Sequence, residues 1–335
     1  DPDQRLQNSL SKPLFQQNGR FNLSANGTGM NDSMLFYFGN ANWNKGKKFI
    51  YINNPDGTMR WIIPAGLHHT PHLALYNAST LKARIYKTAS SVLFALGKGE
   101  LLASGTFCVE DHIVTAMEER FGISPGENYA VFTGTRGNTR KVVIATGRQT
   151  ITHFIKIAIS DKSSQLINNE ANMLKELTKY DFTTLSLPRV TDPRINGTAR
   201  LTNVKPAATI PAQKINDLHI RTLTELYSVS HETKGLSQSA AWKSISNNMD
   251  WMQREHELTN GLDELKTRRI IHLLRKLYNS LPTDLKIPVS VSHGDFTPWN
   301  MYCDVHRLYV YDWELSSNGI PMLFDLFHFV MQSQA

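Results

Sequence analysis

The segment 293–314 constrains this chain more than any other part of the sequence. It contains Asp295, then Asn300 after four intervening residues, and then Asp312 after eleven more. Residues 301–311 have the pattern of two short strands joined by a turn, so the hairpin should bring Asp312 back beside Asn300. Three side chains that carry oxygen atoms are therefore expected to converge from one loop and one hairpin.

Such a convergence suits phosphoryl transfer. An acceptor hydroxyl needs a carboxylate that can take its proton, and nucleotide phosphates need Mg²⁺, which prefers hard oxygen ligands. A lone Asp or Asn in a loop is more often a turn former or a helix cap. The prediction therefore depends on the combined spacing, and His293 is expected to hold the loop backbone rather than to take part in the chemistry.

The segment closely resembles the catalytic and metal-binding motifs of the aminoglycoside phosphotransferase and choline kinase-like superfamily, which shares the protein-kinase fold. The His-Gly-Asp-x₄-Asn loop looks like the catalytic loop of that superfamily, which implies that Asp295 is the base and Asn300 a metal ligand. Asp312-Trp313-Glu314 looks like its metal-binding element, which implies that Asp312 is a second ligand. In the trailing Gly-x-Pro-x₃-Asp-Leu match, Asp325 is expected to be a hydrogen-bonding anchor.

The resemblance covers roughly residues 121–335. It implies an α+β, bilobal protein-kinase-like fold that binds ATP and Mg²⁺. A small antiparallel sheet should form the nucleotide-binding lobe over 121–210, and a mainly helical lobe with the catalytic loop should follow over 211–335, with a hinge near 200–212. Residues 1–120 form an accessory region with no counterpart in the motif set. The start at Asp1 rather than Met, and the end soon after Asp325, lead us to expect a fragment.

A candidate nucleotide-binding lysine lies upstream, in the middle of a predicted strand over 152–159. Lys156 has apolar neighbours on both sides, and a lysine in such a place needs a charged partner or a ligand. In the kinase pattern a lysine of this kind binds the α- and β-phosphates and is oriented by a helix glutamate, for which Glu170 is the match. The alternative is a lysine on a solvated edge and a glutamate on a helix surface.

The turn 133–139 occupies the place of a phosphate-covering loop. Its glycines, Gly134 and Gly137, allow close approach of the backbone, and Arg136 could face phosphate. The turn lacks a complete Gly-x-Gly-x-x-Gly pattern, and an ordinary hairpin turn is nearly as good an interpretation.

Charge is distributed unevenly along the 335 residues, whose net charge is +7. Residues 130–210 contain 12 Lys or Arg against 5 Asp or Glu, so the whole excess lies there, whereas residues 211–335 contain 12 against 14. A basic block can bind phosphate, nucleic acid or an anionic membrane, or it can be a solvated face. The slightly acidic C-terminal block does not favour a strongly cationic acceptor.

The chain has two widely separated cysteines, no signal peptide pattern and no apolar run long enough to span a bilayer, which favours a cytoplasmic protein. The cluster His68-His69-x-x-His72 could suggest a metal site, but a histidine-rich loop is the better interpretation because no carboxylate or cysteine lies nearby.

The sequence therefore predicts an ATP-dependent kinase that phosphorylates a hydroxyl group on a small molecule or glycan. It predicts no nucleic-acid partner and no transmembrane segment, and it does not determine the oligomeric state. One alternative is a catalytically silent kinase-like protein that binds nucleotide or a partner. A second is a nucleic-acid-binding protein that uses the basic block, although basic and aromatic residues are not interleaved in it.

Overall fold

The computed structural model describes residues 46–76, 80–135, 137–191, 197–206, 209–258, 264–282 and 284–334. These residues form two compact units. Unit 1 contains the described residues up to Lys175 together with Pro188–Pro206, and unit 2 contains Glu176–Leu187 together with the described residues from 209 onwards. The chain passes from unit 1 to unit 2 after Lys175, returns at Pro188 and passes to unit 2 again after Pro206. The hinge near 200–212 stays a prediction.

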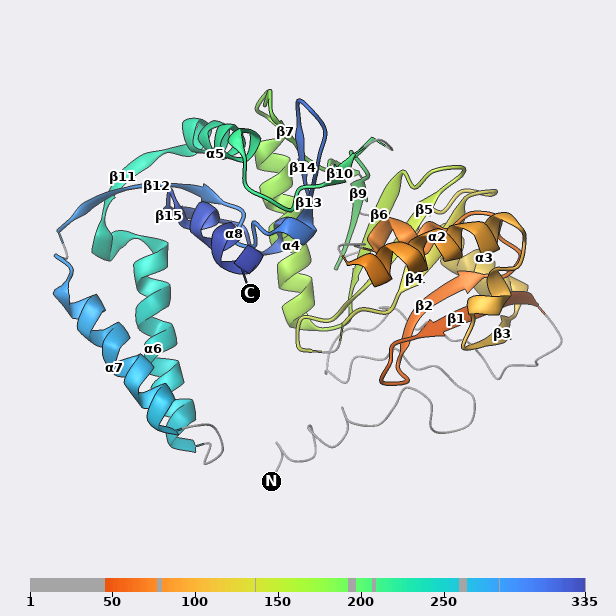
Figure 1. The fold of residues 1–335 in the computed structure, drawn as a ribbon, viewed down its shortest axis with the longest axis horizontal. Coiled ribbons are helices and arrows are strands. Elements are labelled where there is room, and N and C mark those ends of the chain that lie inside the picture. The colour runs from red at the N-terminus through yellow and green to blue at the C-terminus, as the bar shows by residue number, and fades with distance from the viewer. Residues whose placement is uncertain are drawn as a thin grey trace. The chain divides into compact units, whose positions relative to one another are not determined.

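Unit 1 is built on one sheet of eight strands, in the order β3-β1-β2-β4-β5-β6-β9-β8, and all neighbouring strands are antiparallel (Figure 1). In chain order the strands are β1 (Lys47–Asn53), β2 (Met59–Pro64), β3 (Gly105–Val109), β4 (Asn128–Phe132), β5 (Lys141–Gly147), β6 (His153–Ala158), β8 (Val190–Thr191) and β9 (Thr198–Thr202). β-Branched and aromatic residues dominate the central strands, as expected where both faces of a sheet are covered.

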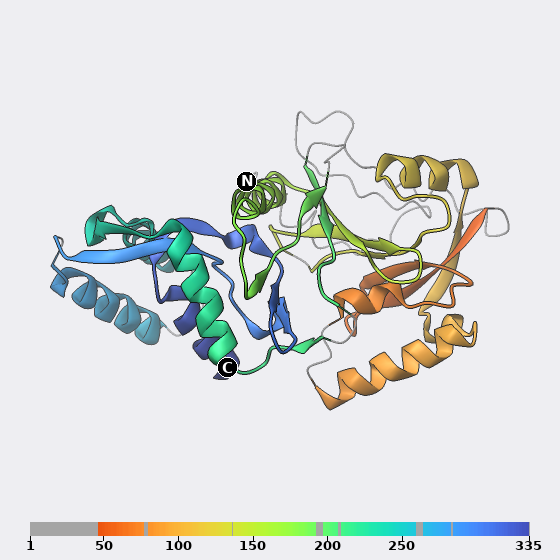
Figure 2. The same cartoon turned by 90° about the horizontal axis from the view of Figure 1, so that it is seen from above.

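Helices cover both faces of this sheet, and Figure 2 shows α2 and α3 on opposite sides of it. α3 (Asp111–Arg120) places Val114 in the larger apolar core, with Phe49 and Ile155 from the sheet. α2 (Leu81–Ala95) places Phe94 in a second core around Trp61. α4 (Asp161–Leu177) follows β6, and the short helices η1 (Pro71–Leu75) and η2 (Gly99–Leu102) flank α2.

The α2 helix does not bury the face on which most of its aliphatic residues lie. The Thr80 side chain caps its N-terminus by accepting from the Ala83 N–H. The apolar residues at helical spacing, among them Leu81 and Ile85, are exposed. Phe94 is buried instead, because it packs in the apolar core around Trp61.

Unit 2 is helix-rich and contains two small sheets. The four-stranded sheet has the order β10-β13-β14-β7, and the three-stranded sheet has the order β11-β12-β15. Their strands are β7 (Leu185–Ser186), β10 (Ile210–Pro211), β11 (Glu232–Gly235), β12 (Lys286–Ser292), β13 (Met301–Cys303), β14 (Leu308–Val310) and β15 (Ser317–Pro321). The helices are α5 (Asp217–Ser230), α6 (Ala240–Leu258), α7 (Glu264–Ser280) and α8 (Phe324–Gln334), with the short turns η3 (Leu236–Gln238), η4 (Pro298–Asn300) and η5 (Trp313–Leu315).

The predicted α+β fold class is confirmed, with an antiparallel sheet in one unit and mainly helices in the other. α6 and α7 lie side by side (Figure 1). The Trp242 and Tyr278 rings stack between them, with centroids 3.8 Å apart. The sheet is continuous across residue 120, since β2 pairs with β4 through Trp61–Phe132 and Ile62–Val131. The division into an accessory region and a kinase-like lobe at that residue stays a prediction.

Candidate active site

The predicted catalytic loop follows β12 and is fastened by a buried carboxylate. Asp325, in the first turn of α8, is only 4% exposed. Its oxygens accept hydrogen bonds from Ser292 Oγ at 2.8 Å, from the His293 N–H at 2.7 Å and from the Gly294 N–H at 3.1 Å. Hydrogen bonds to a charged acceptor are stronger than neutral ones. Asp325 is thus the hydrogen-bonding anchor that the sequence predicted.

His293 ties this loop to the end of the hairpin beyond it. The Asp295 N–H donates to His293 Nδ1 at 3.2 Å, and His293 Nε2 lies 2.9 Å from the Tyr311 carbonyl oxygen. Since a backbone N–H only donates and a carbonyl only accepts, the ring carries its proton on Nε2. Burial lowers the pKa of His293, although the carboxylates of Asp325, Asp312 and Asp295 act in the opposite direction. A neutral imidazole that holds the backbone agrees with the prediction.

Gly294 is required where it stands in this loop. Its φ is +80°, and a Cβ atom added there would lie 2.2 Å from the carbonyl oxygen of Leu315. Any other residue would combine a strained backbone with a collision against the turn that follows Asp312. The glycine therefore lets the catalytic loop and that turn approach each other closely.

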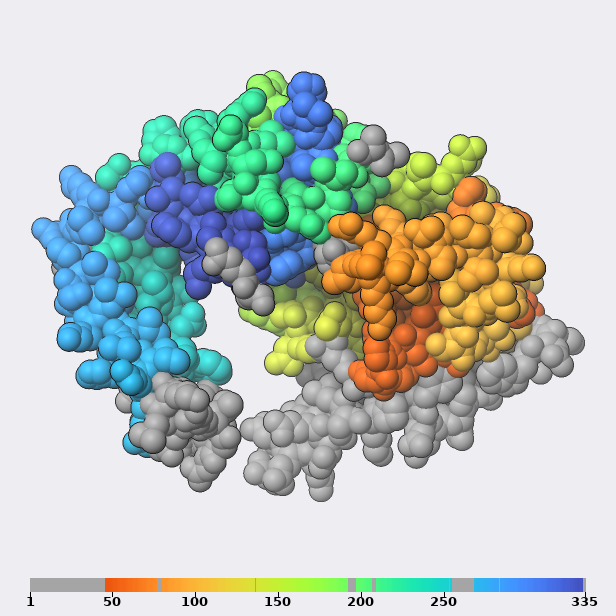
Figure 3. All heavy atoms as spheres, viewed as in Figure 1, coloured from red at the N-terminus to blue at the C-terminus, as the bar shows by residue number. Residues whose placement is uncertain are grey.

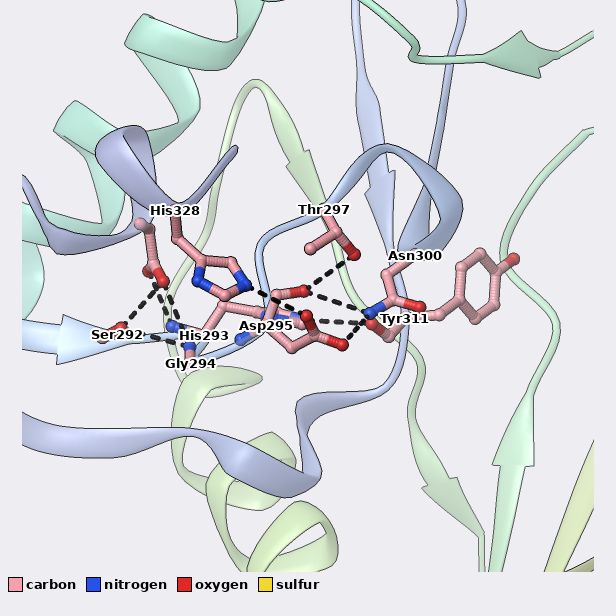
Figure 4. A network of polar contacts seen from close by, with 9 residues as sticks. Ser292, His293, Gly294, Asp295, Thr297, Asn300, Tyr311 and His328 are labelled. Carbon is pink, nitrogen blue, oxygen red and sulfur yellow. Dashed lines mark hydrogen bonds and ion pairs between the residues drawn. The ribbon is translucent and has the colours of Figure 1, made fainter. Parts of the chain in front are cut away.

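Two side chains hold the two oxygens of the Asp295 carboxylate (Figure 4). Asn300 Nδ2 donates to Oδ2 at 2.8 Å and to the Asp295 backbone oxygen at 3.0 Å. His328 Nε2, from α8, lies 3.2 Å from Oδ1. The Asp295 side chain is 30% exposed, so a hydroxyl group can still approach it. The arrangement holds the carboxylate in one orientation without burying it.

The β13–β14 hairpin brings Asp312 back to Asn300, as the sequence predicted. Met301 pairs with Val310, and the Tyr311 N–H donates to the Asn300 carbonyl at 2.9 Å. Asp312 has φ 66° and ψ 58°, and among the described residues other than glycine only Asp312 has a positive φ. Strained backbone of this kind is frequent at functional sites.

The residues of this hairpin fit a magnesium ion. The carboxylate oxygens of Asp312 and Glu314 lie within 4.8 Å of each other. Asn300 uses its nitrogen for the contacts with Asp295, and Figure 4 shows its side-chain oxygen turned away from that carboxylate. Carboxylate and amide oxygens are the ligand types that Mg²⁺ binds. The roles of Asn300 and Asp312 as metal ligands stay predictions.

In unit 1, Lys156 and Glu170 form a buried ion pair. Lys156 Nζ lies 2.8 Å and 2.6 Å from the two oxygens of Glu170, and the side chains are 10% and 0% exposed. Lys156 lies on β6 between two other strands and alternates with Ile155 and Ile157, which point to the α3 side. The solvated-edge alternative is therefore excluded, whereas nucleotide binding by this pair stays a prediction.

The turn between β4 and β5 requires at least one of its glycines. Gly134 has φ +81°, and an added Cβ atom would lie 2.1 Å from the Lys141 carbonyl oxygen. Gly137 has φ +145° and open space around it, so a side chain there would be strained but would meet no atom. Ser160 Oγ donates to the Asn138 carbonyl, which joins the turn to the start of α4. Arg136 lies outside the described residues, and the binding of phosphate by this turn stays a prediction.

Sequence reasoning missed His328 as a residue of the site. A signal was present in the spacing, because His328 follows Asp325 by three residues and the structure makes this segment the helix α8. Side chains three apart on a helix lie on one face. Because Asp325 anchors the catalytic loop to α8, His328 on the same face of the helix also lies against that loop.

The three histidines of the cluster lie in different surroundings, and His72 belongs to the short helix η1 rather than to a loop. His68 and His69 are exposed, whereas His72 is fully buried between Trp61 and Phe94. Among the described residues these histidines do not form a metal-binding group. In the same part of the chain, no helix is both long enough and apolar enough to cross a membrane. The cytoplasmic location stays a prediction.

The comparison with protein families defines the class of this protein. The sequence model of the phosphotransferase enzyme family matches residues 129–333, which include both the Lys156–Glu170 pair and the loop of Asp295. The chain belongs to the phosphotransferase enzyme family. No curated protein sequence matches it significantly.

Several solved structures are similar to the chain at low identity. The ternary complex of streptomycin, ATP and APH(2")-IIa has 13% identity and a TM-score of 0.42, over 63% of this chain and 72% of that one. A choline/ethanolamine kinase family protein from Mesorhizobium loti has 14% identity and a TM-score of 0.42, over 66% and 71%. Glucosamine kinase in complex with glucosamine, ADP and inorganic phosphate has 12% identity and a TM-score of 0.37, over 66% and 64%.

Proposed function

We propose that this protein transfers the γ-phosphoryl group of ATP, bound with Mg²⁺, to a hydroxyl group of a small molecule or glycan. The observation that carries the proposal is the Asp295 carboxylate, which Asn300 and His328 hold by its two oxygens at the end of a loop that Asp325 fastens. A carboxylate fixed in orientation but open to solvent is what a phosphoryl acceptor needs as its base.

Each side chain has a definite task in this proposal. Asp295 orients the acceptor hydroxyl and takes its proton as the bond from that oxygen to the γ-phosphorus forms, while the bond from the γ-phosphorus to the bridging oxygen breaks and ADP leaves. Asn300 and Asp312 would hold the magnesium ion, which neutralises charge on the phosphates. Lys156, kept extended by Glu170, would bind the α- and β-phosphates.

Positioning and electrostatic stabilisation would supply most of the rate, as is usual for phosphoryl transfer. His293 contributes indirectly, because its two hydrogen bonds fix the backbone at Asp295 and at Tyr311. The His293 ring therefore holds the backbone at both Asp295 and Tyr311, the residue before Asp312.

The test is a screen for phosphorylated products with the full chain, ATP and Mg²⁺ over a panel of sugars, glycosides, amino alcohols and aminoglycosides. Asp295→Asn keeps the shape of the side chain but removes the base, and we expect turnover to fall by about 10²- to 10⁴-fold. Asp284→Asn, at an exposed aspartate before β12, is the matched control and should keep full activity.

Turnover that is unchanged in Asp295→Asn would refute the assignment of the base. Binding of ATP without turnover on any acceptor would instead support the catalytically silent alternative. Equilibrium binding of ATP, measured with and without Mg²⁺ on the same samples, separates these two outcomes.

A further inference from the structure

The side chains of α8 that face the catalytic loop range from fully buried to solvent-exposed. Asp325 points into the loop, and Phe329 is buried against Phe296 and His219, with ring centroids 6.1 Å and 5.0 Å apart. His328 lies between this buried side and the solvent, where it contacts Asp295. Residues four apart on a helix are neighbours on one face, so Phe324 lies beside His328 on the surface of α8.

Phe324 and His328 together form an aromatic wall beside Asp295, the proposed base. The two rings are stacked, with centroids 5.9 Å apart and an interplanar angle of 17°. Phe324 is 41% exposed, so part of its ring remains open. Figure 3 shows the atoms of α8, in dark blue, at the surface of unit 2. A hydroxyl compound that reaches Asp295 from this side therefore meets an aromatic surface.

This surface carries almost no charge. Asp325 is the single acidic residue of α8, and its carboxylate is buried and already accepts three hydrogen bonds. The helix has no lysine or arginine. A polycationic acceptor needs several exposed carboxylates as partners, and α8 adds none to the Asp295 carboxylate that His328 contacts. One face of a pyranose ring, in contrast, presents C–H groups that pack on an aromatic ring, while its hydroxyl groups stay hydrogen-bonded.

We propose that Phe324 and His328 form the acceptor subsite and that they select an uncharged sugar ring over a polycationic acceptor. The proposal rests on the proposed function, because Asp295 must be the base for this wall to face the acceptor. Phe324 provides the stacking surface. His328 fixes Oδ1 of the carboxylate and borders the acceptor hydroxyl. The acceptor is thus an uncharged pyranose or pyranoside with a free hydroxyl group.

The test measures acceptor binding directly, by saturation-transfer NMR on the full chain with ADP and Mg²⁺. The probes are the methyl pyranosides of glucose, galactose, mannose and N-acetylglucosamine, with kanamycin as the polycation. We expect transfer to the ring C–H protons of at least one pyranoside and a weaker effect for kanamycin. Phe324→Leu keeps the apolar volume but loses the flat ring, and should weaken pyranoside binding about 3- to 10-fold. Phe324→Tyr should restore binding.

Phe327→Leu is the matched control, because Phe327 is an exposed phenylalanine of the same helix that lies outside the stacked pair. It should leave pyranoside binding unchanged. Equal binding in Phe324→Leu and the unmodified chain, or a preference for kanamycin over every pyranoside, would overturn the subsite. ATP turnover is measured on the same samples. If turnover depends on Asp295 but no pyranoside binds, the subsite is refuted and the proposed function stands. If Asp295→Asn leaves turnover unchanged, both the proposed function and the subsite are refuted.

Discussion

Replacing His72 by phenylalanine should remove a pH dependence that burial creates in unit 1. The His72 side chain is fully buried, its ring centroid lies 5.9 Å from that of Trp61 and 5.3 Å from that of Phe94, and neither ring nitrogen has a hydrogen-bond partner. Burial lowers the pKa of His72 from 6.5 to about 4. Between these values the unfolded chain binds a proton that the folded chain does not, so stability falls as the pH falls through this window.

The size of the effect follows from the two pKa values. Each pKa unit corresponds to about 1.4 kcal/mol, so the loss is about 2 kcal/mol at pH 5 and approaches about 3 kcal/mol at pH 4. At pH 7 it nearly vanishes, because the unfolded histidine is then mostly neutral as well. A buried phenylalanine has no proton to gain, and His72→Phe should therefore lose less stability than the unmodified chain on acidification.

Hydrogen exchange of β2 and α2 peptides, corrected for the intrinsic pH dependence of exchange, gives the opening free energy of unit 1 at each pH. The difference between His72→Phe and the unmodified chain isolates this histidine from the others. His69→Phe, at an exposed position, is the control and should follow the unmodified chain. Parallel pH profiles for His72→Phe and the unmodified chain, or a directly titrated pKa near 6.5 for His72, would refute the reasoning.

Three further predictions concern the catalytic residues and their supports. Asp325→Ala removes the acceptor of three buried hydrogen bonds and should lower the stability of unit 2 by about 3–6 kcal/mol in urea unfolding; a loss below about 1 kcal/mol would contradict its anchoring role. Lys156→Met removes the ammonium group that pairs with the buried Glu170 carboxylate, at a cost of about 3–5 kcal/mol, which the double variant with Glu170→Leu should largely recover; equal melting temperatures of the single and double variants would argue against the pair. His328→Ala should lower kcat but not the KM for ATP, and His328→Asn should partly restore kcat; a lower melting temperature with unchanged kcat would show a structural role alone.

Much of the candidate site could be read from the sequence because it is local. Asp295, Asn300 and Asp312 lie on one loop and one hairpin, and the turn between short strands decides where the chain returns. Lys156 was recognisable because a charged residue among apolar neighbours on a strand must find a partner, and Glu170 is that partner.

Other features depend on contacts between distant segments and could not be predicted. The buried face of α2 is decided by the sheet that receives Phe94, and periodicity alone pointed to the exposed aliphatic residues. The pairing of β2 with β4 joins segments about 70 residues apart, and no hairpin turn connects these two strands, so the sequence has no local signal for the pairing. His328 has no motif of its own, and its only signal was the spacing of three residues from Asp325, because its position depends on where Asp325 fastens the helix.

The pairing of β2 with β4 also has a consequence for how such a protein can evolve. Trp61 of β2 contacts Phe132 of β4, with ring centroids 4.8 Å apart, only two residues before Gly134. A chain that began at residue 121 would leave the outer edge of β4 bare, and a bare edge strand recruits other strands. Recombination or truncation at that boundary should therefore give a protein that aggregates through this edge.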